Sequence, residues 1–300
     1  MSAQPDLRLS LSAGAASVAV AGTLVALKLW ALWHTGALSI AASLADSAMD
    51  LMMSLAAAVA ILYAARPADD DHAFGHNSAE DLAALAQALF ILGSAAAISW
   101  GAVGRLMSPV APVIEGEAAG MVVILISMAL TLVLVWWQGR VAARTGNKVV
   151  AADRLHYLGD LIPSLGALVA LWASSRFGIT RIDAIVALGA SGIMAFGALQ
   201  IGRGAWHALM DRQADPATIA RIGEIAAAWP GVHGYHDLKT RTSGSRLFVY
   251  LHIELDGTQT LRQAHDIGAA LRRALLAEFP GADVIIHKDV AAVPGGHPGT

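Results

Sequence analysis

The sequence predicts a membrane protein with six transmembrane helices over residues 1–210, followed by a small cytoplasmic α+β domain over residues 211–293. Of its 300 residues, 56% are apolar and only 14% are charged, about half the charged share of a soluble domain. The charge is also uneven, because residues 1–210 hold 24 charged side chains and residues 211–300 hold 19. The first part is therefore too poor in charge to be soluble, whereas the second has the composition of an ordinary soluble domain.

Two counts exclude whole classes of function. A net charge of −3 offers no basic surface for nucleic acid. The absence of cysteine excludes disulfides, thiolate catalysis and every cysteine-based zinc motif. Any metal site must therefore be built from aspartate, glutamate and the 11 histidines of the chain.

Six mostly apolar stretches reach the ~20 residues that a helix needs to cross a bilayer. They run from about Leu9 to Trp33, Leu38 to Ala65, Leu82 to Met107, Ala118 to Trp137, Val149 to Ala173 and Ile182 to Met210. The leader MSAQPDL lacks the basic region of a signal peptide, so the first stretch is predicted to be a retained span. It contains a single charge, Lys28.

Six spans place both termini on one side of the membrane. Basic residues favour the cytoplasmic side of a membrane protein. The side of the termini would carry Arg8, Arg66, Arg140, Arg144 and Lys148, and the opposite side Arg105, Arg176 and Arg181. We therefore expect both termini to be cytoplasmic.

The C-terminal domain is predicted to have the order αββαβ, a small sandwich of a sheet and two helices. Asp215 and Pro216 form an N-cap followed by proline at the first helical position. A strand is expected at about 236–241, and apolar residues alternate from 246 to 255 as in a second strand. A second helix is expected at about 259–279 and a third strand at 282–287. Residues 294–300, with two prolines, are expected to form a disordered tail.

The second predicted span contains two carboxylates, Asp46 and Asp50, four residues apart on one helix face. Burying one unpaired carboxylate in a membrane helix costs roughly 2.5–3.5 kcal/mol. Two like charges on one face raise that cost further. The pair therefore needs a cation, a proton or a basic partner, unless it forms a polar face near the membrane surface.

The fifth predicted span contains His156 and Asp160 at the same spacing. If the two spans pack together, Asp46, Asp50, His156 and Asp160 supply the four ligands that zinc prefers. The alternative is a local His–carboxylate pair at the span entrance, which neighbouring Asp153 and Arg154 would make solvated. Metal needs a neutral imidazole and ionised carboxylates, so metal and protons compete for such a site. That competition is the chemical basis of antiport, with His156 and Asp50 as the expected proton-coupling residues.

Two further groups lie outside the predicted spans. In the loop after the second span, Asp69, His72 and His76 have spacing that could hold one zinc, or could simply form a solvated acidic loop. In the C-terminal domain, His287 and Asp289 share a strand face and His252 lies on the polar face of its own strand. Sequence cannot show whether these side chains converge, and each histidine alone could be an ordinary surface residue.

These residues together resemble the cation diffusion facilitator family, most closely its bacterial zinc/iron efflux branch. The resemblance covers about residues 11–293. It rests on ADSAMD at 45–50, DDDHAFGHNSAEDLAALAQ at 69–87, LHYLGD at 155–160, YHDLKTR at 235–241 and DVIIHKD at 283–289.

The resemblance implies a homodimer of six-span protomers in the bacterial inner membrane, with a cytoplasmic domain of metallochaperone-like fold. It implies export of divalent metal in exchange for protons by alternating access. By motif position, the transport site would be Asp46, Asp50, His156 and Asp160, and the loop site Asp69, His72 and His76. A binuclear site that ties the cytoplasmic domains together would be His236, His252, His265, His287 and Asp289.

The chain departs from the family pattern at Ser78. There, the close relatives are expected to have a lysine that pairs with an aspartate at the end of the sixth span, matched here by Asp211. We therefore expect a looser junction between membrane and cytoplasmic parts, or a substitute cation such as Arg203 or Arg212.

The leading hypothesis is thus a proton-coupled exporter of zinc, with cadmium and ferrous iron also suited to three oxygens and one nitrogen. The nitrogen of His156 argues against manganese. The absence of a P-loop argues against an ATP-driven pump, and the absence of HExxH against an intramembrane metalloenzyme. A membrane metal sensor with a signalling cytoplasmic domain is the alternative.

Overall fold

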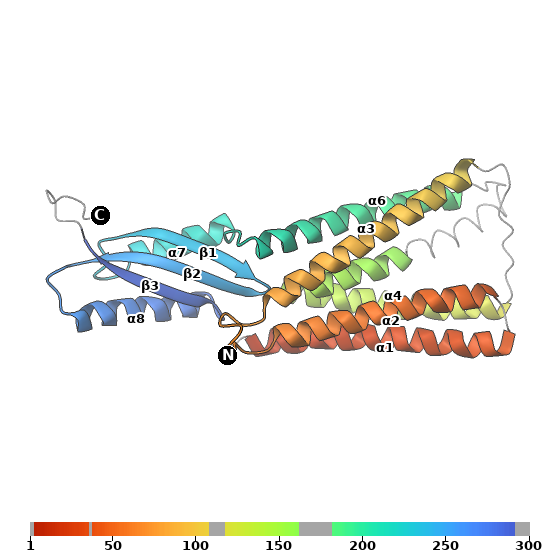
Figure 1. Ribbon diagram of the computed structural model, residues 1–300, viewed down its shortest axis with the longest axis horizontal. Helices are drawn as coiled ribbons and strands as arrows, with labels where there is room; N and C mark the ends of the chain where they lie inside the picture. The colour runs from red at the N-terminus through yellow and green to blue at the C-terminus, as the bar shows by residue number, and fades with distance from the viewer. Residues whose placement is uncertain (1–2, 36–37, 108–117, 162–181, 292–300) are drawn as a thin grey trace. The chain divides into compact units, whose positions relative to one another are not determined.

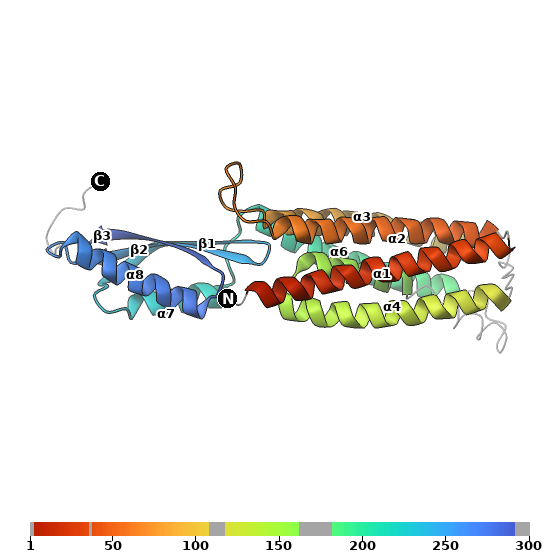
Figure 2. The ribbon, with the colours of Figure 1, turned by 90° about the horizontal axis from the view of Figure 1, so that it is seen from below.

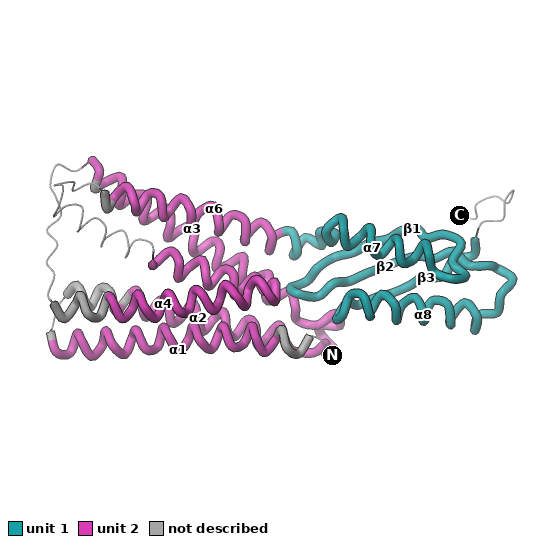
Figure 3. The backbone as a smooth tube through the Cα atoms, turned by 180° about the vertical axis from the view of Figure 1, so that it is seen from behind, with its two compact units in different colours: residues 1–5, 207–300 teal, residues 6–206 magenta. Residues whose placement is uncertain are grey.

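The computed structural model describes residues 3–35, 38–107, 118–161 and 182–291. The chain divides into two compact units, one formed by residues 6–206 and the other by residues 1–5 with 207–300 (Figure 3). Each unit has its own apolar core.

The first unit is a bundle of long helices (Figure 1). Its labelled helices are α1 (Ala3–Thr35), α2 (Leu38–Ala64), α3 (Ser78–Met107), α4 (Ala118–Thr145) and α6 (Ile182–Leu209). In the described residues, these 5 helices are long and apolar enough to cross a membrane. A further helix occupies residues 148–161, where the fifth span was predicted to begin. The remainder of that predicted span, 162–173, lies outside the described residues.

Close approach of backbones holds the helix 148–161 against α6. A Cβ atom placed on Gly159 would collide with Met194 of α6, and a Cβ on Gly197 of α6 would come within 2.8 Å of Leu155. Small residues at such contacts let membrane helices pack by van der Waals attraction, since lipid provides no hydrophobic drive between them. The two glycines therefore fix the position of the helix that carries His156.

A second apolar contact joins α3 to α6, which lie side by side in both ribbon views (Figures 1 and 2). Their shared core contains Ala88, Ile91 and Ala95 of α3 with Met194 and Ala198 of α6. Met194 takes part in both contacts, so α6 connects α3 to the helix 148–161.

The second unit has the predicted order αββαβ. Its elements are α7 (Pro216–Ala227), β1 (Gly234–Ser243), β2 (Arg246–Leu255), α8 (Leu261–Glu278) and β3 (Asp283–Val290). The sheet order is β1-β2-β3, with β1 antiparallel and β3 parallel to β2. Asp215 caps α7 through the backbone of Thr218, as the sequence predicts.

Both helices cover one face of the sheet (Figure 2). The core on that face includes Ile222 of α7, Leu271 and Leu275 of α8, and Leu251 and Ile253 of β2. Side chains alternate along a strand, so the residues between these in β2 point to the other face. That uncovered face is the one that bears His252.

The buried face of α8 gives a direct test of this core. Leu271 is completely buried, whereas Leu261 at the start of the same helix is 84% exposed. Leu271→Ala should destabilise the C-terminal unit by about 2–5 kcal/mol, because it removes buried methyl groups and leaves a cavity. Leu261→Ala makes the same chemical change and should have little effect. Thermal unfolding of the two purified variants measures the difference, and equal stabilities would contradict this description of the core.

Candidate metal centres

Three ionisable side chains from two helices meet inside the membrane unit. Asp50 of α2 and His156 and Asp160 of the helix 148–161 offer ligand atoms that all lie within 4.8 Å of one another. His156 Nε2 is 3.0 Å from Asp50 Oδ1 and 3.8 Å from Asp160 Oδ2. His156 is buried and the two carboxylates are close enough to share one ion with it. The structure thus brings together three of the four residues predicted for the transport site.

The fourth predicted residue, Asp46, lies one turn before Asp50 on α2 and has an exposed side chain. It is not part of the three-residue group. Its carboxylate nevertheless interacts electrostatically with Asp160, so it contributes negative charge to the same region. Its role as a ligand stays a prediction.

A buried hydrogen bond supports the group from the side. Ser54 Oγ and Tyr157 Oη lie 2.8 Å apart, and Tyr157 is 1% exposed. Since Ser54 is four residues after Asp50 and Tyr157 follows His156, this bond joins the two helices beside the ligands. The ring of His156 also packs edge-on against Phe90 of α3, with centroids 5.9 Å apart. The spacing of Ser54 from Asp50 was the one sequence signal that could have revealed this bond.

The expectation that Asp153 marks a solvated entrance was wrong. Asp153 is 3% exposed, and its Oδ2 accepts hydrogen bonds from Ser17 Oγ of α1 at 2.6 Å and Gln138 Nε2 of α4 at 2.7 Å. Gln138 Nε2 also donates to Ser17 Oγ at 2.9 Å. Only Arg154, which is exposed, fits the predicted entrance. Asp153 instead ties its helix to α1 and α4 through the hydrogen bonds of its Oδ2, while Asp153 Oδ1 and Gln138 Oε1 are buried without a hydrogen-bond partner among the described residues.

The loop between α2 and α3 forms the second group, from Asp69, His72 and His76. The two oxygens of Asp69 are divided between the histidines, with Oδ1 3.1 Å from His72 Nδ1 and Oδ2 3.3 Å from His76 Nε2. Desolvation of Asp69 is outweighed by hydrogen bonds from the backbone and ring of His72, which hold the pKa of the carboxyl below its usual range. His76 is buried and packs edge-on against Tyr63. The spacing predicted this convergence, and the short turn produces it.

The third group crosses the open face of the C-terminal sheet. His236, His252 and His287 are register partners on β1, β2 and β3, so they form a row across the three strands. Asp289 Oδ2 lies 2.8 Å from His252 Nδ1 and 3.3 Å from His236 Nε2, and its Oδ1 lies 3.1 Å from His287 Nε2. Hydrogen bonding to His252 holds the pKa of Asp289 below its usual range. One carboxylate therefore contacts all three imidazoles.

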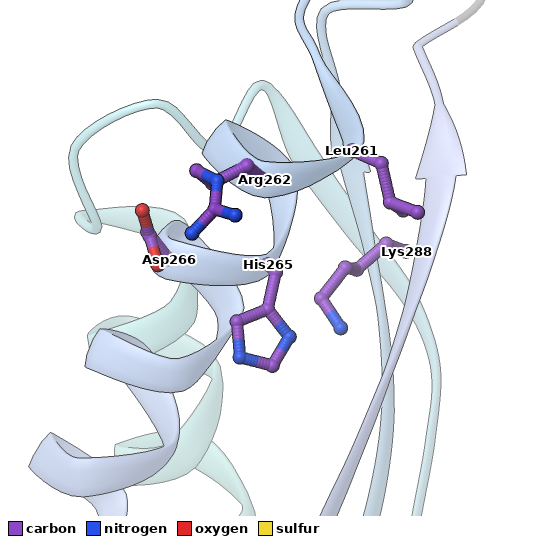
Figure 4. A pocket seen from close by; sticks show the side chains of 5 residues that line it. All are labelled: Leu261, Arg262, His265, Asp266 and Lys288. Carbon is purple, nitrogen blue, oxygen red and sulfur yellow. The ribbon is translucent and has the colours of Figure 1, made fainter.

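His265, the fifth residue predicted for this site, lies elsewhere. It is on α8 and lines a hollow with Leu261, Arg262, Asp266 and Lys288 (Figure 4). Lys288 points away from His287 and Asp289, because neighbouring side chains on a strand face opposite ways. His265 is therefore on the helix-covered side of the sheet, and its role as a ligand stays a prediction.

Asp211 pairs with a cation that was not considered from the sequence. Arg241 Nη1 of β1 lies 3.0 Å from Asp211 Oδ1, within the C-terminal unit. Arg203 or Arg212 was expected from the sequence as the substitute cation, whereas this ion pair is formed by Arg241. The expectation of a looser junction at Ser78 stays a prediction.

The long apolar helices define a multi-pass membrane protein. One group of ionisable ligands lies among these helices and two further His–Asp groups lie outside them, so the protein is equipped to handle metal ions. Residues 15–210 match the cation efflux transmembrane domain, and residues 214–290 match the cation efflux protein cytoplasmic domain. The chain belongs to the cation efflux family.

Two relatives are similar in sequence along nearly the whole chain. It is 44% identical over 288 residues to the cation-efflux pump FieF of Pectobacterium carotovorum subsp. carotovorum strain PC1, covering 96% of this chain and 95% of the relative. It is 42% identical to FieF of Cronobacter sakazakii strain ATCC BAA-894, covering 95% and 94%. A structure of CzrB in its zinc form is 31% identical over 27% of this chain and 93% of that chain, with a TM-score of 0.26.

The chain is therefore a transporter that exports divalent metal, and not an enzyme. Its C-terminal unit is the family's dimerisation domain, which is consistent with a homodimer.

The Ser54–Tyr157 hydrogen bond predicts a specific pattern of stabilities. Tyr157→Phe leaves the buried Ser54 hydroxyl unpaired and should cost about 1–3 kcal/mol. The double variant Ser54→Ala with Tyr157→Phe removes both partners and should recover part of that loss. A double-mutant cycle on thermal unfolding measures the coupling, and purely additive effects would contradict the bond.

Proposed function

We propose that the protein is a proton-coupled antiporter that exports Zn²⁺, and also Cd²⁺ or Fe²⁺, from the cytoplasm by alternating access. The convergence of Asp50, His156 and Asp160 within the apolar bundle carries this proposal. We further propose a homodimer in the bacterial inner membrane with both termini cytoplasmic, as the distribution of basic residues favours.

The chemistry of the group supports exchange of metal for protons. A metal must use the same lone pair of His156 Nε2 that a proton would occupy. A proton at this nitrogen has Asp50 Oδ1 as its acceptor at 3.0 Å and Asp160 Oδ2 close by at 3.8 Å. Proton and metal therefore bind the same atoms, so loading one releases the other. Asp46, one turn away, would complete a four-ligand site by turning toward the group.

The donor set supports zinc over manganese. Zinc accepts imidazole nitrogen together with carboxylate oxygen, whereas manganese suits oxygen ligands. The absence of cysteine leaves ligands that bind zinc less firmly than thiolates and that protons displace more readily.

We propose structural Zn²⁺ for the C-terminal group and a metal-binding role for the loop group. In the C-terminal group, Asp289 would bridge two ions, one held with His236 and His252 and the other with His287. The contact of each Asp289 oxygen with a different side of the histidine row supports this arrangement. His265, which lies on the helix-covered side of the sheet, could not join these ligands without a change of position.

The exposed histidine row would also suit a membrane metal sensor. A sensor, however, gives no reason to bury three ionisable residues between apolar helices. Zinc flux in proteoliposomes with an imposed pH gradient distinguishes the two, because a sensor binds zinc without moving it.

Replacement of Asp50 tests the transport site. Asp50→Ala should reduce zinc flux in proteoliposomes to that of empty liposomes, because His156 loses its nearest carboxylate. The variant should remain dimeric by size-exclusion chromatography. Asp71→Ala removes an exposed carboxylate outside all three groups and should transport as the unmodified protein does. Substantial zinc flux through Asp50→Ala would refute the site.

Replacement of His156 tests metal choice. His156→Asp converts the group to oxygen ligands alone and should shift preference from zinc toward manganese. Flux measured with a panel of zinc, cadmium, ferrous iron and manganese shows the shift. An unchanged preference for zinc would mean that His156 does not select the metal.

A further inference from the structure

A lysine lies inside the membrane span of α1. Lys28 belongs to the candidate span Leu7–His34, where its neighbours in sequence are apolar. A charged side chain in such a position costs roughly 2.5–3.5 kcal/mol even on the most lenient scale, so it usually has a partner and a function. None of the three metal-type groups includes it.

One hydrogen-bond partner of Lys28 lies next to the transport site in sequence. Lys28 Nζ donates a hydrogen bond of 2.6 Å to Ser47 Oγ, and Ser47 is 1% exposed. Ser47 follows Asp46 directly and lies three residues before Asp50, so it sits on the face of α2 that turns toward the ligands. Lys28 therefore reaches the site across the α1–α2 contact.

Its ammonium group also interacts with the site over a longer range. The carboxylates of Asp50, Asp46 and Asp160 are near enough to attract the ammonium group of Lys28. These are the three carboxylates predicted for the transport site. Although Lys28 does not bind metal, it is part of the electrostatic environment of the bound ion.

The charges of the four predicted transport-site residues and their ion balance when Lys28 is included; Asp153, whose Oδ2 accepts hydrogen bonds from Ser17 and Gln138, is outside this count. Three ionised carboxylates carry −3, a divalent ion reduces this to −1, and one ammonium group brings the total to zero with His156 neutral. Net charge at a site that is partly removed from water is costly, because water solvates it less well there. Without Lys28, the metal-loaded site would carry an uncompensated negative charge among apolar helices.

We propose that Lys28 is the fixed counter-charge of the transport site, and that its positive charge weakens zinc binding enough for the ion to be released. This inference rests on the proposed function, since it assumes that zinc occupies the Asp50–His156–Asp160 group. A positive charge beside a divalent ion lowers its affinity by Coulomb repulsion. Removing the charge should therefore tighten zinc binding and slow its departure, which is the reverse of the effect of removing a ligand.

The test separates charge from shape. Lys28→Met keeps a long unbranched side chain but removes its charge and its hydrogen bond to Ser47 Oγ, whereas Lys28→Arg keeps the charge. Zinc flux in proteoliposomes is measured at pH 8, where protons compete least with the metal. Lys28→Met should lower both KM and kcat, each by on the order of tenfold. Lys28→Arg should restore values near those of the unmodified protein. Lys239→Met, in the C-terminal unit, controls for a general loss of positive charge.

Several results would overturn the inference. They are a raised KM or unchanged kinetics for Lys28→Met, or the same defect in Lys28→Arg. If Lys28→Met does not fold, Lys28→Gln replaces it, because its amide can still donate to Ser47 Oγ. Failure of the proposed function appears differently, as absence of zinc flux in the unmodified protein. In that case zinc titrations are made on the unmodified protein and on Lys28→Met, each with and without Asp50→Ala. The zinc binding that is lost with Asp50→Ala belongs to this group, and its affinity shows whether the charge of Lys28 lowers it.

Discussion

The contact between His156 Nε2 and Asp50 Oδ1, at 3.0 Å, is the interaction on which the membrane unit depends. The two helices are mostly apolar, although Asp46 lies on α2 and Asp153 and Asp160 lie on the helix 148–161, so each of the two side chains is buried at less cost beside the other. An unpaired carboxylate in this place would be strongly unfavourable, whereas a carboxylate beside an imidazole can share a proton or a cation. The same requirement fixes the packing of α2 against the helix 148–161. The site and the fold around it are therefore consequences of one electrostatic constraint.

Hydrogen bonds and small residues hold the helix 148–161 on each side of its ligands. Asp153 connects it to α1 and α4 through Ser17 and Gln138, and Tyr157 connects it to α2 through Ser54. On its remaining side, Gly159 allows Met194 of α6 to approach closely. Because apolar surfaces are not driven together in lipid, polar bonds and close backbone contact must supply the specificity. Asp153, which adds one more carboxylate, is acceptable there because two neutral donors satisfy one of its oxygens.

The sequence predicted best those features that depend on local periodicity. The four-residue spacing from Asp46 to Asp50 and from His156 to Asp160 predicted that each pair shares one helix face. The alternation in β2 predicted that His252 lies on the open face of the sheet. Sequence could not show which side chains meet across elements. The burial of Asp153 depends on Ser17, 136 residues away, and the pairing of Asp211 depends on Arg241. The exposure of Asp46 and the separation of His265 likewise follow from side-chain direction, which spacing does not determine.

The C-terminal group differs from the inner one in the exposure of its histidines, and this difference bears on their roles. The side chains of His236, His252 and Asp289 are 45%, 35% and 32% exposed. In the inner group those of His156 and Asp50 are 10% and 18% exposed, while that of Asp160 is 47% exposed. An exposed group can exchange its ion with water at any time. An ion at His156 must instead be stripped of water, and every charge nearby acts on it with little screening. Small changes of charge around His156 should therefore alter metal affinity strongly, which suits a site that must bind and then release its ion.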